Sequence, residues 1–194
     1  MLNYPWSRHF QRYEYVMQKG YITNKTVLDI GCGTSYGTIA MSSIAKLAEG
    51  LDPEFEHMPP GVLLIPAKSK SVGVHKTTLE MLALNTKLKY DVCVAIEVFE
   101  HIMYPFNFIK DMASMGDYAF ITTPLSNVTK NTRNKEHIAE YSSADFKTII
   151  STRYRILKMV YQYPDLSIKN HGAYCGDSFD PRHRVQMAWC KRKK

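Results

Sequence analysis

The sequence lacks the features of membrane-spanning and secreted proteins. Across its 194 residues no apolar run approaches the length of a membrane span, which is roughly 18 residues. Residues 1–9 contain no hydrophobic stretch of the kind that a signal peptide carries. We therefore expect a soluble protein of the cytoplasm, without a membrane partner.

Cysteine is scarce, and its positions follow no pattern. Cys32, Cys93, Cys175 and Cys190 have neither the paired spacing of a zinc site nor that of a disulfide framework. Two of them fall in apolar segments that predict buried strands, where cysteine acts as a small core residue. This usage fits a reducing compartment. Internal repeats and a composition shift that would mark a second domain are also absent.

The composition is that of a single folded domain. A length of 194 residues suits one domain, and 45% hydrophobic content is enough for a core. The formal charge of +7 would suit a polyanionic partner, but part of it comes from residues 191–194, Lys-Arg-Lys-Lys, which fit a solvated tail equally well. The charge therefore supports a nucleic acid partner only weakly.

The most informative segment is 26–37, Thr-Val-Leu-Asp-Ile-Gly-Cys-Gly-Thr-Ser-Tyr-Gly. It predicts a buried strand, a tight turn and a helix. Gly31 and Gly33 lack the Cβ atoms that would keep a ligand away from the backbone at the turn. Gly37 follows Gly33 by four residues instead of three, and Asp29 lies two residues before the first glycine. The motif therefore differs from the dinucleotide-binding fingerprint.

An acidic residue follows the second predicted strand. Residues 47–51 lead to Asp52 and Pro53, about twenty residues beyond the first glycine, where nucleotide-binding folds place a carboxylate that accepts from both ribose hydroxyls. We predict that Asp52 binds a ribose. The alternative is a turn aspartate before a proline.

The second informative segment is 90–102. Residues 90–96 predict a central buried strand, and Glu97-Val98-Phe99-Glu100-His101 follows at once. A helical turn that begins there would project Glu97, Glu100 and His101 from one face, because they stand at i, i+3 and i+4. Two carboxylates and an imidazole would then converge at the carboxyl edge of the sheet, where open α/β sheets bind ligands.

The other segments continue an alternation of strands and helices. Helices are predicted at 6–19, 39–45, 105–115 and 142–150, and strands at 27–30, 47–51, 72–75, 90–96, 117–123, 154–163 and 185–190. After the second strand, Pro53, Pro59 and Pro60 disfavour a full helix, and 61–66 suits a further short strand. Residues 164–184 predict a long loop rich in Gly, Asp, His and Pro.

Asp-x-Gly-x-Gly at 29–33, with this element order, resembles class I S-adenosylmethionine (SAM) dependent methyltransferases. The resemblance covers residues 12–190 and is strongest at 26–37, 90–102 and 118–124. It implies a Rossmann-like α/β fold, a seven-stranded class I methyltransferase sheet with helices on both faces, in a single domain. Its expected parts are an N-terminal lid helix (1–25), a core (26–163), a loop insertion (164–184) and a last strand with a basic tail (185–194). It also implies SAM as cofactor, bound by Asp29, Gly31, Cys32, Gly33, Asp52, Ile96 and Glu97.

Three further features resemble the metal-dependent O-methyltransferases that act on the 3′-terminal ribose of small RNAs or on catechol-type quinone precursors. They are Glu-x-x-Glu-His at 97–101, Thr-Thr-Pro at 122–124, and His137 ahead of Glu-Tyr-Ser at 140–142. The resemblance implies one divalent ion (Mg, Mn, Fe, Co or Zn) held by Glu97, Glu100, His101 and His137. That ion would bind two adjacent hydroxyls of a small-molecule, sugar or ribose acceptor.

The sequence departs from these families in two places. Residues 124–135 lack the Pro-Asn and the longer insert of the RNA enzymes. After the third strand, where family members carry an acidic residue for the adenine amino group, this chain has Lys76, Thr77 and Thr78. Adenine would then be held by a hydroxyl or by backbone.

Three alternatives stay open. A metal-independent methyltransferase of small molecules would use His101 or His137 as the catalytic base. An NAD-dependent oxidoreductase would use the same glycine turn, and Tyr154-x-x-x-Lys158 has the spacing of the short-chain dehydrogenase pair, although 155–160 predicts a strand and that pair belongs on a helix. A catalytically inactive SAM-binding protein is the third. The sequence identifies neither the acceptor nor the oligomeric state.

Overall fold

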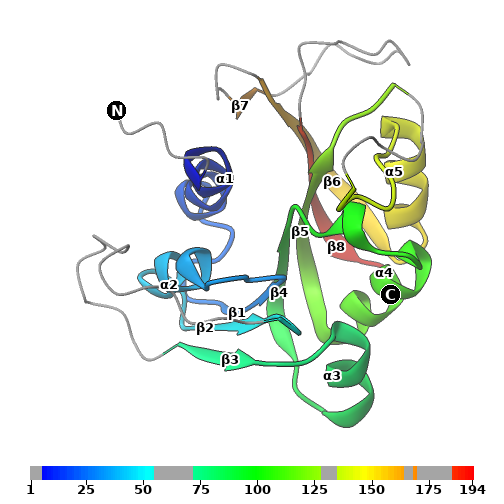
Figure 1. Cartoon of the computed structure of the whole chain (residues 1–194). Helices are drawn as coiled ribbons and strands as arrows, with labels where there is room; N and C mark the ends of the chain where they lie inside the picture. Colours follow the sequence, from blue (N-terminus) through cyan, green and yellow to red (C-terminus); the bar gives the residue numbers. More distant parts are fainter. Residues whose placement is uncertain (1–5, 55–71, 128–134, 164–167, 170–184) are drawn as a thin grey trace.

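A single mixed sheet, covered by helices on both faces, forms the body of the molecule (Figure 1). The structure is a computed structural model, which describes residues 6–54, 72–127, 135–163, 168–169 and 185–194. The strand order is β3-β2-β1-β4-β5-β8-β6-β7. The seven strands predicted within these described ranges are present, and the two-residue β7 adds an eighth at one edge.

The strands have the directions of a Rossmann-like methyltransferase sheet. They are β1 (Thr26–Ile30), β2 (Leu47–Leu51), β3 (Gly73–His75), β4 (Tyr90–Ile96), β5 (Gly116–Pro124), β6 (Tyr154–Gln162), β7 (Ile168–Lys169) and β8 (Val185–Arg192). β1 to β5 pair in parallel, whereas β8 is antiparallel to both β5 and β6. The parallel strands therefore bring their carboxyl ends to one edge, where ligands bind in open sheets.

The helices lie in two layers. They are α1 (Trp6–Gln18), α2 (Tyr36–Ser42), α3 (Leu79–Asn85), α4 (Pro105–Met115) and α5 (Ser143–Ser151), with a 3₁₀ turn, η1 (Phe99–His101). Figure 1 shows α1 and α2 on one side of the sheet and α4 and α5 on the other. α2 begins earlier than predicted, because the turn before it closes at Ser35, whose φ is 65°, and it ends at Ser42.

A hydrophobic core on each face holds the layers together. Along β4, Val92 and Val94 face the core shared with α1 and α2, whereas Cys93 and Ala95 face the core shared with α3, α4 and α5. A strand buried on both faces reads as a continuous apolar run, which is why 90–96 was identifiable from the sequence.

Some predictions fall on residues that the structure does not describe. These are the interrupted segment 55–71 with its predicted strand at 61–66, the loop 164–184 apart from β7, and Cys175. The other three cysteines are free and buried, as predicted. None of the helices in the described ranges is long and apolar enough to cross a membrane.

Gly37 allows α1 to pack on α2. A Cβ atom built at Gly37 would clash with the ring of Tyr13 on α1. We predict that Gly37→Ala lowers the free energy of unfolding by about 1–3 kcal/mol, the usual cost of overpacking. Urea unfolding followed by circular dichroism measures it. In a Tyr13→Ala background the penalty should disappear, because the two changes share one contact. An equal penalty in both backgrounds would contradict this explanation.

Candidate functional site

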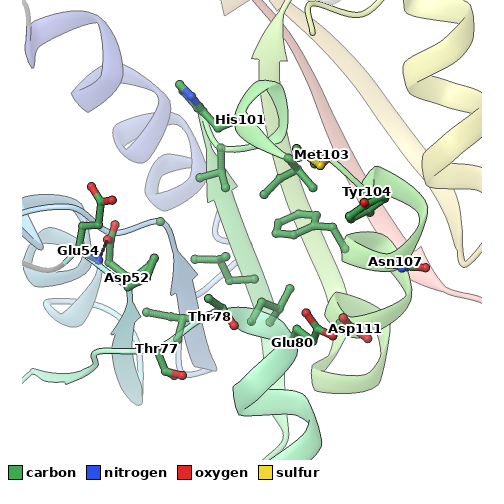
Figure 2. A pocket seen from close by; sticks show the side chains of 18 of the residues that line it. Asp52, Glu54, Thr77, Thr78, Glu80, His101, Met103, Tyr104, Asn107 and Asp111 are labelled. Atoms are coloured by element: carbon green, nitrogen blue, oxygen red, sulfur yellow. Dashed lines mark hydrogen bonds between the residues drawn. The ribbon is translucent and has the colours of Figure 1, made fainter. Parts of the chain in front are cut away.

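A pocket of about 810 Å³ lies at the carboxyl edge of the parallel strands (Figure 2). It is lined by Gly31 after β1, Asp52 after β2, Thr77 and Thr78 after β3, and Glu97 after β4. The rest of the wall comes from residues beside these strand ends, Pro53, Glu54 and Val98 among them, and from α3, the segment 101–104 and α4. The pocket therefore occupies the edge that the sequence analysis predicted for the ligand.

The glycine turn and Asp52 are joined by hydrogen bonds. The backbone N–H of Gly33 donates to Oδ2 of Asp52 over 2.9 Å, and the N–H of Glu54 donates to its Oδ1 over 2.9 Å. Apart from Gly33 itself and its two chain neighbours, no heavy atom of the described residues lies within 4 Å of the point where a Cβ of Gly33 would be. The carboxylate is thus held at the pocket wall, and each of its oxygens retains a lone pair for a ligand hydroxyl.

Asp29 supports the turn from beneath and does not line the pocket. Its side chain is fully buried, and it accepts hydrogen bonds from Thr38 (2.6 Å) and from the Tyr13 hydroxyl (3.2 Å). Burial raises the pKa of Asp29 to about 7, against the opposing effect of these two bonds. Asp29 therefore connects the glycine turn to α1 and α2.

The structure divides the predicted cofactor residues into two groups. Gly31, Asp52 and Glu97 line the pocket. The others lie around it: Asp29, Cys32, Gly33 and Ile96. Cys32 is buried, and burial raises the pKa of its thiol to about 11.

Glu97 adopts a conformation that the sequence did not predict. Its φ is 55°, and the 3₁₀ turn begins two residues later, at Phe99. The prediction of a helical turn starting at Glu97 was therefore wrong, and Glu97 does not share a helical face with Glu100 and His101. The cause is a pair of bonds with Thr122 on β5: the Glu97 N–H donates to Thr122 Oγ1 (3.1 Å), and that hydroxyl donates to Glu97 Oε1 (3.2 Å).

Arg12 connects α1 to this part of the site. Its Nη1 lies 3.3 Å from Oε1 of Glu97, and only 4% of the arginine side chain and 15% of the glutamate side chain are exposed. Arg12 Nε also donates to Gln162 on β6 over 2.9 Å. Arg12 thus links α1 to Glu97, which directly follows β4, and to Gln162 at the end of β6.

Three of the four predicted metal ligands lie together. Glu100, His101 and His137 each offer one ligand atom, and these atoms lie within 4.8 Å of one another. Glu97 is outside this group of three. Glu100 is buried and accepts from the Thr123 hydroxyl over 3.0 Å. Burial first, and then the negative charge of Glu97, raises the pKa of Glu100 well above its ordinary value.

The loop that carries His137 packs against η1. The N–H groups of Ile138 and Ala139 both donate to the backbone oxygen of Glu100, over 2.8 and 3.2 Å. Nδ1 of His101 lies 2.6 Å from the backbone oxygen of Glu136. The rings of His101 and His137 are 5.1 Å apart and nearly perpendicular. His101 also lines the pocket, so the three-residue group adjoins it.

Sequence reasoning missed the pocket wall formed by α3 and α4. Glu80, Asn107 and Asp111 line it, and Figure 2 shows Glu80 and Asp111 together between the two helices. Burial raises the pKa of Asp111, Lys110 lowers it, and Glu80 raises it further. Asn107 and Asp111 stand at i and i+4, but this spacing is equally typical of a solvent-exposed helix face.

The pair with dehydrogenase spacing lies on β6. Tyr154 is fully buried, and its hydroxyl donates to the backbone oxygen of Gly116 over 3.4 Å. Tyr154 and Lys158 belong to a strand, in which residues four apart cannot act as the helical pair does. Tyr154 and Lys158 therefore do not form the catalytic pair of a short-chain dehydrogenase.

Comparison with known proteins agrees with this geometry. A family model described as a methyltransferase domain matches residues 8–165. Ubiquinone biosynthesis O-methyltransferases are among the relatives: that of Serratia proteamaculans is 28% identical over 155 residues, which are 78% of this chain and 58% of the relative. That of Shewanella sp. is 31% identical over 121 residues, 60% of this chain and 51% of the relative. The chain thus spans about half the length of the curated relatives it matches.

Solved structures share the fold at low identity. A Burkholderia thailandensis 1,6-didemethyltoxoflavin-N1-methyltransferase aligns with a TM-score of 0.72 and 10% identity, over 98% of this chain and 80% of the other. A Synechocystis magnesium protoporphyrin IX methyltransferase aligns with a TM-score of 0.66 and 15% identity, over 100% of this chain and 89% of the other. The fold predicted from the sequence is confirmed, and the chain belongs to the methyltransferase domain family, with the fold of the class I SAM-dependent enzymes.

Proposed function

We propose that the protein is a SAM-dependent methyltransferase that methylates a hydroxyl of a small apolar acceptor with two adjacent hydroxyls, assisted by one divalent metal ion. The observation that carries this proposal is the group of Glu100, His101 and His137 directly beside the pocket. A cofactor pocket and a cation site with a shared wall are what metal-assisted O-methylation requires.

The charge of the pocket supports SAM as the cofactor. Five carboxylates line it, those of Asp52, Glu54, Glu80, Glu97 and Asp111. SAM carries a sulfonium and an ammonium group, so a pocket of negative potential attracts it. Asp52, whose carboxylate accepts from the N–H groups of Gly33 and Glu54, would also accept from the ribose hydroxyls, and the open space at Gly33 suits the methionine part. Proteins with this fold, such as the Synechocystis enzyme, have been solved with SAM or S-adenosylhomocysteine bound.

The residues near His101 fit a divalent ion. A buried carboxylate beside two imidazoles is a mixed oxygen and nitrogen set, which suits Mn, Fe, Co or Zn and tolerates Mg. Glu100, His101 and His137 would hold the ion, while Glu97 is engaged by Arg12 and Thr122. Bound there, the ion would lower the pKa of an acceptor hydroxyl. This chain would orient the acceptor and hold the SAM methyl group beside it.

The surroundings of the site favour an apolar acceptor over an RNA end. Met103 and Tyr104 line the pocket and are 64% and 67% exposed, and Ile138 beside His137 is 40% exposed. No lysine or arginine is found among the described residues that line the pocket, and its five carboxylates would repel phosphates. A catechol-type ring would pack against the exposed apolar side chains of Met103, Tyr104 and Ile138 at the rim of the pocket. The names of the ubiquinone biosynthesis relatives agree with this class.

A metal-independent reaction is the second candidate, and one observation favours it. His137 Nδ1 lies 3.1 Å from a carboxylate oxygen of Glu140, the arrangement that orients a catalytic base in hydrolase triads. His137 would then remove the acceptor proton without an ion. Methyl transfer that survives exhaustive EDTA treatment would select this candidate.

The first test concerns the ion. We predict that Glu100→Gln weakens Mn²⁺ binding by more than the roughly 10–100-fold typical of outer-shell changes, because it removes the only carboxylate of the three-residue group. Glu80→Gln is the matched control and should leave Mn²⁺ affinity nearly unchanged, because Glu80 lines the pocket on α3 and does not belong to the three-residue group. Isothermal titration calorimetry measures both. Equal losses would assign the effect to the negative charge of the pocket and not to ligation, and no Mn²⁺ binding by the wild type would refute the metal site.

The second test concerns the cofactor. Asp52→Ala should weaken SAM binding by about 1.5–3 kcal/mol, the value of hydrogen bonds to a charged group, or about ten- to a hundredfold. Asp117→Ala is a suitable control, because Asp117 is exposed and pairs with Arg192 at the opposite end of β5. Calorimetry that finds equal SAM affinity in wild type and Asp52→Ala would contradict the assignment of the ribose ligand.

A further inference from the structure

We propose that Glu140 is a positioning residue that makes His137 a metal ligand, by accepting a hydrogen bond from Nδ1 and so keeping Nε2 available to the ion. The proposal deepens the metal site of the proposed function and rests on it. It assigns a role to a side chain that neither lines the pocket nor belongs to the three-residue group.

His137 needs positioning because it lies in neither a helix nor a strand. Its backbone is anchored on the C-terminal side, where Ile138 and Ala139 donate to the oxygen of Glu100. Further along, the N–H of Ser126 donates to the oxygen of Tyr141 over 3.1 Å. These bonds hold the backbone but not the side-chain torsions of the imidazole, whose ring packs against that of His101. Packing between rings does not select a tautomer, so an acceptor at one ring nitrogen is required for that.

Glu140 provides that contact. Its Oε1 lies 3.1 Å from Nδ1 of His137, and the two side chains are 25% and 15% exposed. A carboxylate only accepts hydrogen bonds, so in a neutral imidazole the proton resides on Nδ1 and the lone pair on Nε2. A carboxylate at the outer nitrogen also makes the inner nitrogen a stronger donor to a metal.

His101 has the same arrangement with a different acceptor. Its Nδ1 lies 2.6 Å from the backbone oxygen of Glu136, and a carbonyl oxygen likewise accepts only. Both imidazoles therefore present Nε2, one through a backbone atom and one through a side chain. Substitution of Glu140 should therefore change the tautomer of His137 and leave that of His101 unchanged.

An ordinary surface ion pair is the competing explanation of the contact. Such a pair at i and i+3 contributes about 0–1 kcal/mol to stability, and it would not select a tautomer of a neutral ring. The deciding measurement is therefore the protonation pattern of His137 in the metal-free protein. Long-range ¹H–¹⁵N correlation spectra at a pH where the ring is neutral distinguish the two tautomers, and His137→Gln assigns the signal.

We expect His137 to be in the Nδ1–H tautomer in the metal-free wild type. In Glu140→Ala the signal should move toward the Nε2–H form, and Glu140→Gln should retain the Nδ1–H form, because its side-chain oxygen still accepts. His101 should be unchanged in both variants. An Nε2–H tautomer in the wild type, or the same His137 spectrum in wild type and Glu140→Ala, would overturn the proposal.

Metal affinity is the second readout. Glu140→Ala should weaken Mn²⁺ binding about 10–100-fold, with Glu140→Gln between it and the wild type, and with little change in urea unfolding. Glu136→Ala removes a carboxylate from the same loop and keeps the carbonyl, so its loss should be small. Equal losses in Glu136→Ala and Glu140→Ala would assign the effect to charge alone. A wild type that binds no Mn²⁺ would refute the metal centre itself, while the tautomer still decides whether Glu140 fixes His137.

Discussion

The buried ion pair between Arg12 and Glu97 is the interaction on which the geometry of the site depends. Both side chains are largely removed from water, so loss of either would leave an uncompensated charge, at a cost of about 3–5 kcal/mol. The pair draws Glu97 toward α1, and Thr122 holds its backbone in the left-handed region. Glu97 is thereby separated from the group of Glu100, His101 and His137, although its charge still affects Glu100.

The N-terminal helix is joined to the pocket at a second point, through the glycine turn. The Tyr13 hydroxyl donates to Asp29, and its ring fills the space that Gly37 leaves open on α2. Asp29 lies at the end of β1 and Glu97 directly follows β4, and these two strands are neighbours. α1 is therefore tied to both strands that flank the floor of the pocket. Displacement of α1 would disturb the glycine turn and Glu97 together.

Negative charge is common to the cofactor pocket and to the adjoining group proposed to bind the metal ion. The pocket carries five carboxylates, and the adjoining group adds the buried Glu100 with its raised pKa. Ionising a buried carboxyl group with a raised pKa is unfavourable when no counter-ion is near, and a neighbouring cation offsets that cost. SAM and the proposed divalent ion are both cations, whereas the exposed rim of Met103 and Tyr104 is apolar. In the proposed function, the charged surface would bind the cofactor and the ion, and the apolar rim would bind the acceptor.

Local sequence was sufficient to predict those parts of the protein that depend on neighbours along the chain. The buried strand 90–96, the helix 105–115 that begins at Pro105, and the glycine turn after 26–30 were identifiable because periodicity, capping and turn chemistry act over a few residues. The same holds for Asp52, whose place at a strand end follows from the alternation of elements. These features together were enough to predict the fold class and the edge of the sheet that carries the pocket.

Only the tertiary structure decided the contacts between distant residues. Arg12 pairs with Glu97, and Glu80 lies near Asp111 on a neighbouring helix. The place of His137 beside Glu100 was expected from the family resemblance alone, because no local pattern joins these two residues. The left-handed backbone of Glu97 has the same origin, because its partner Thr122 is on another strand. Such contacts arise from the packing of separate elements in three dimensions, and no periodicity along the chain records which side chains that packing brings together.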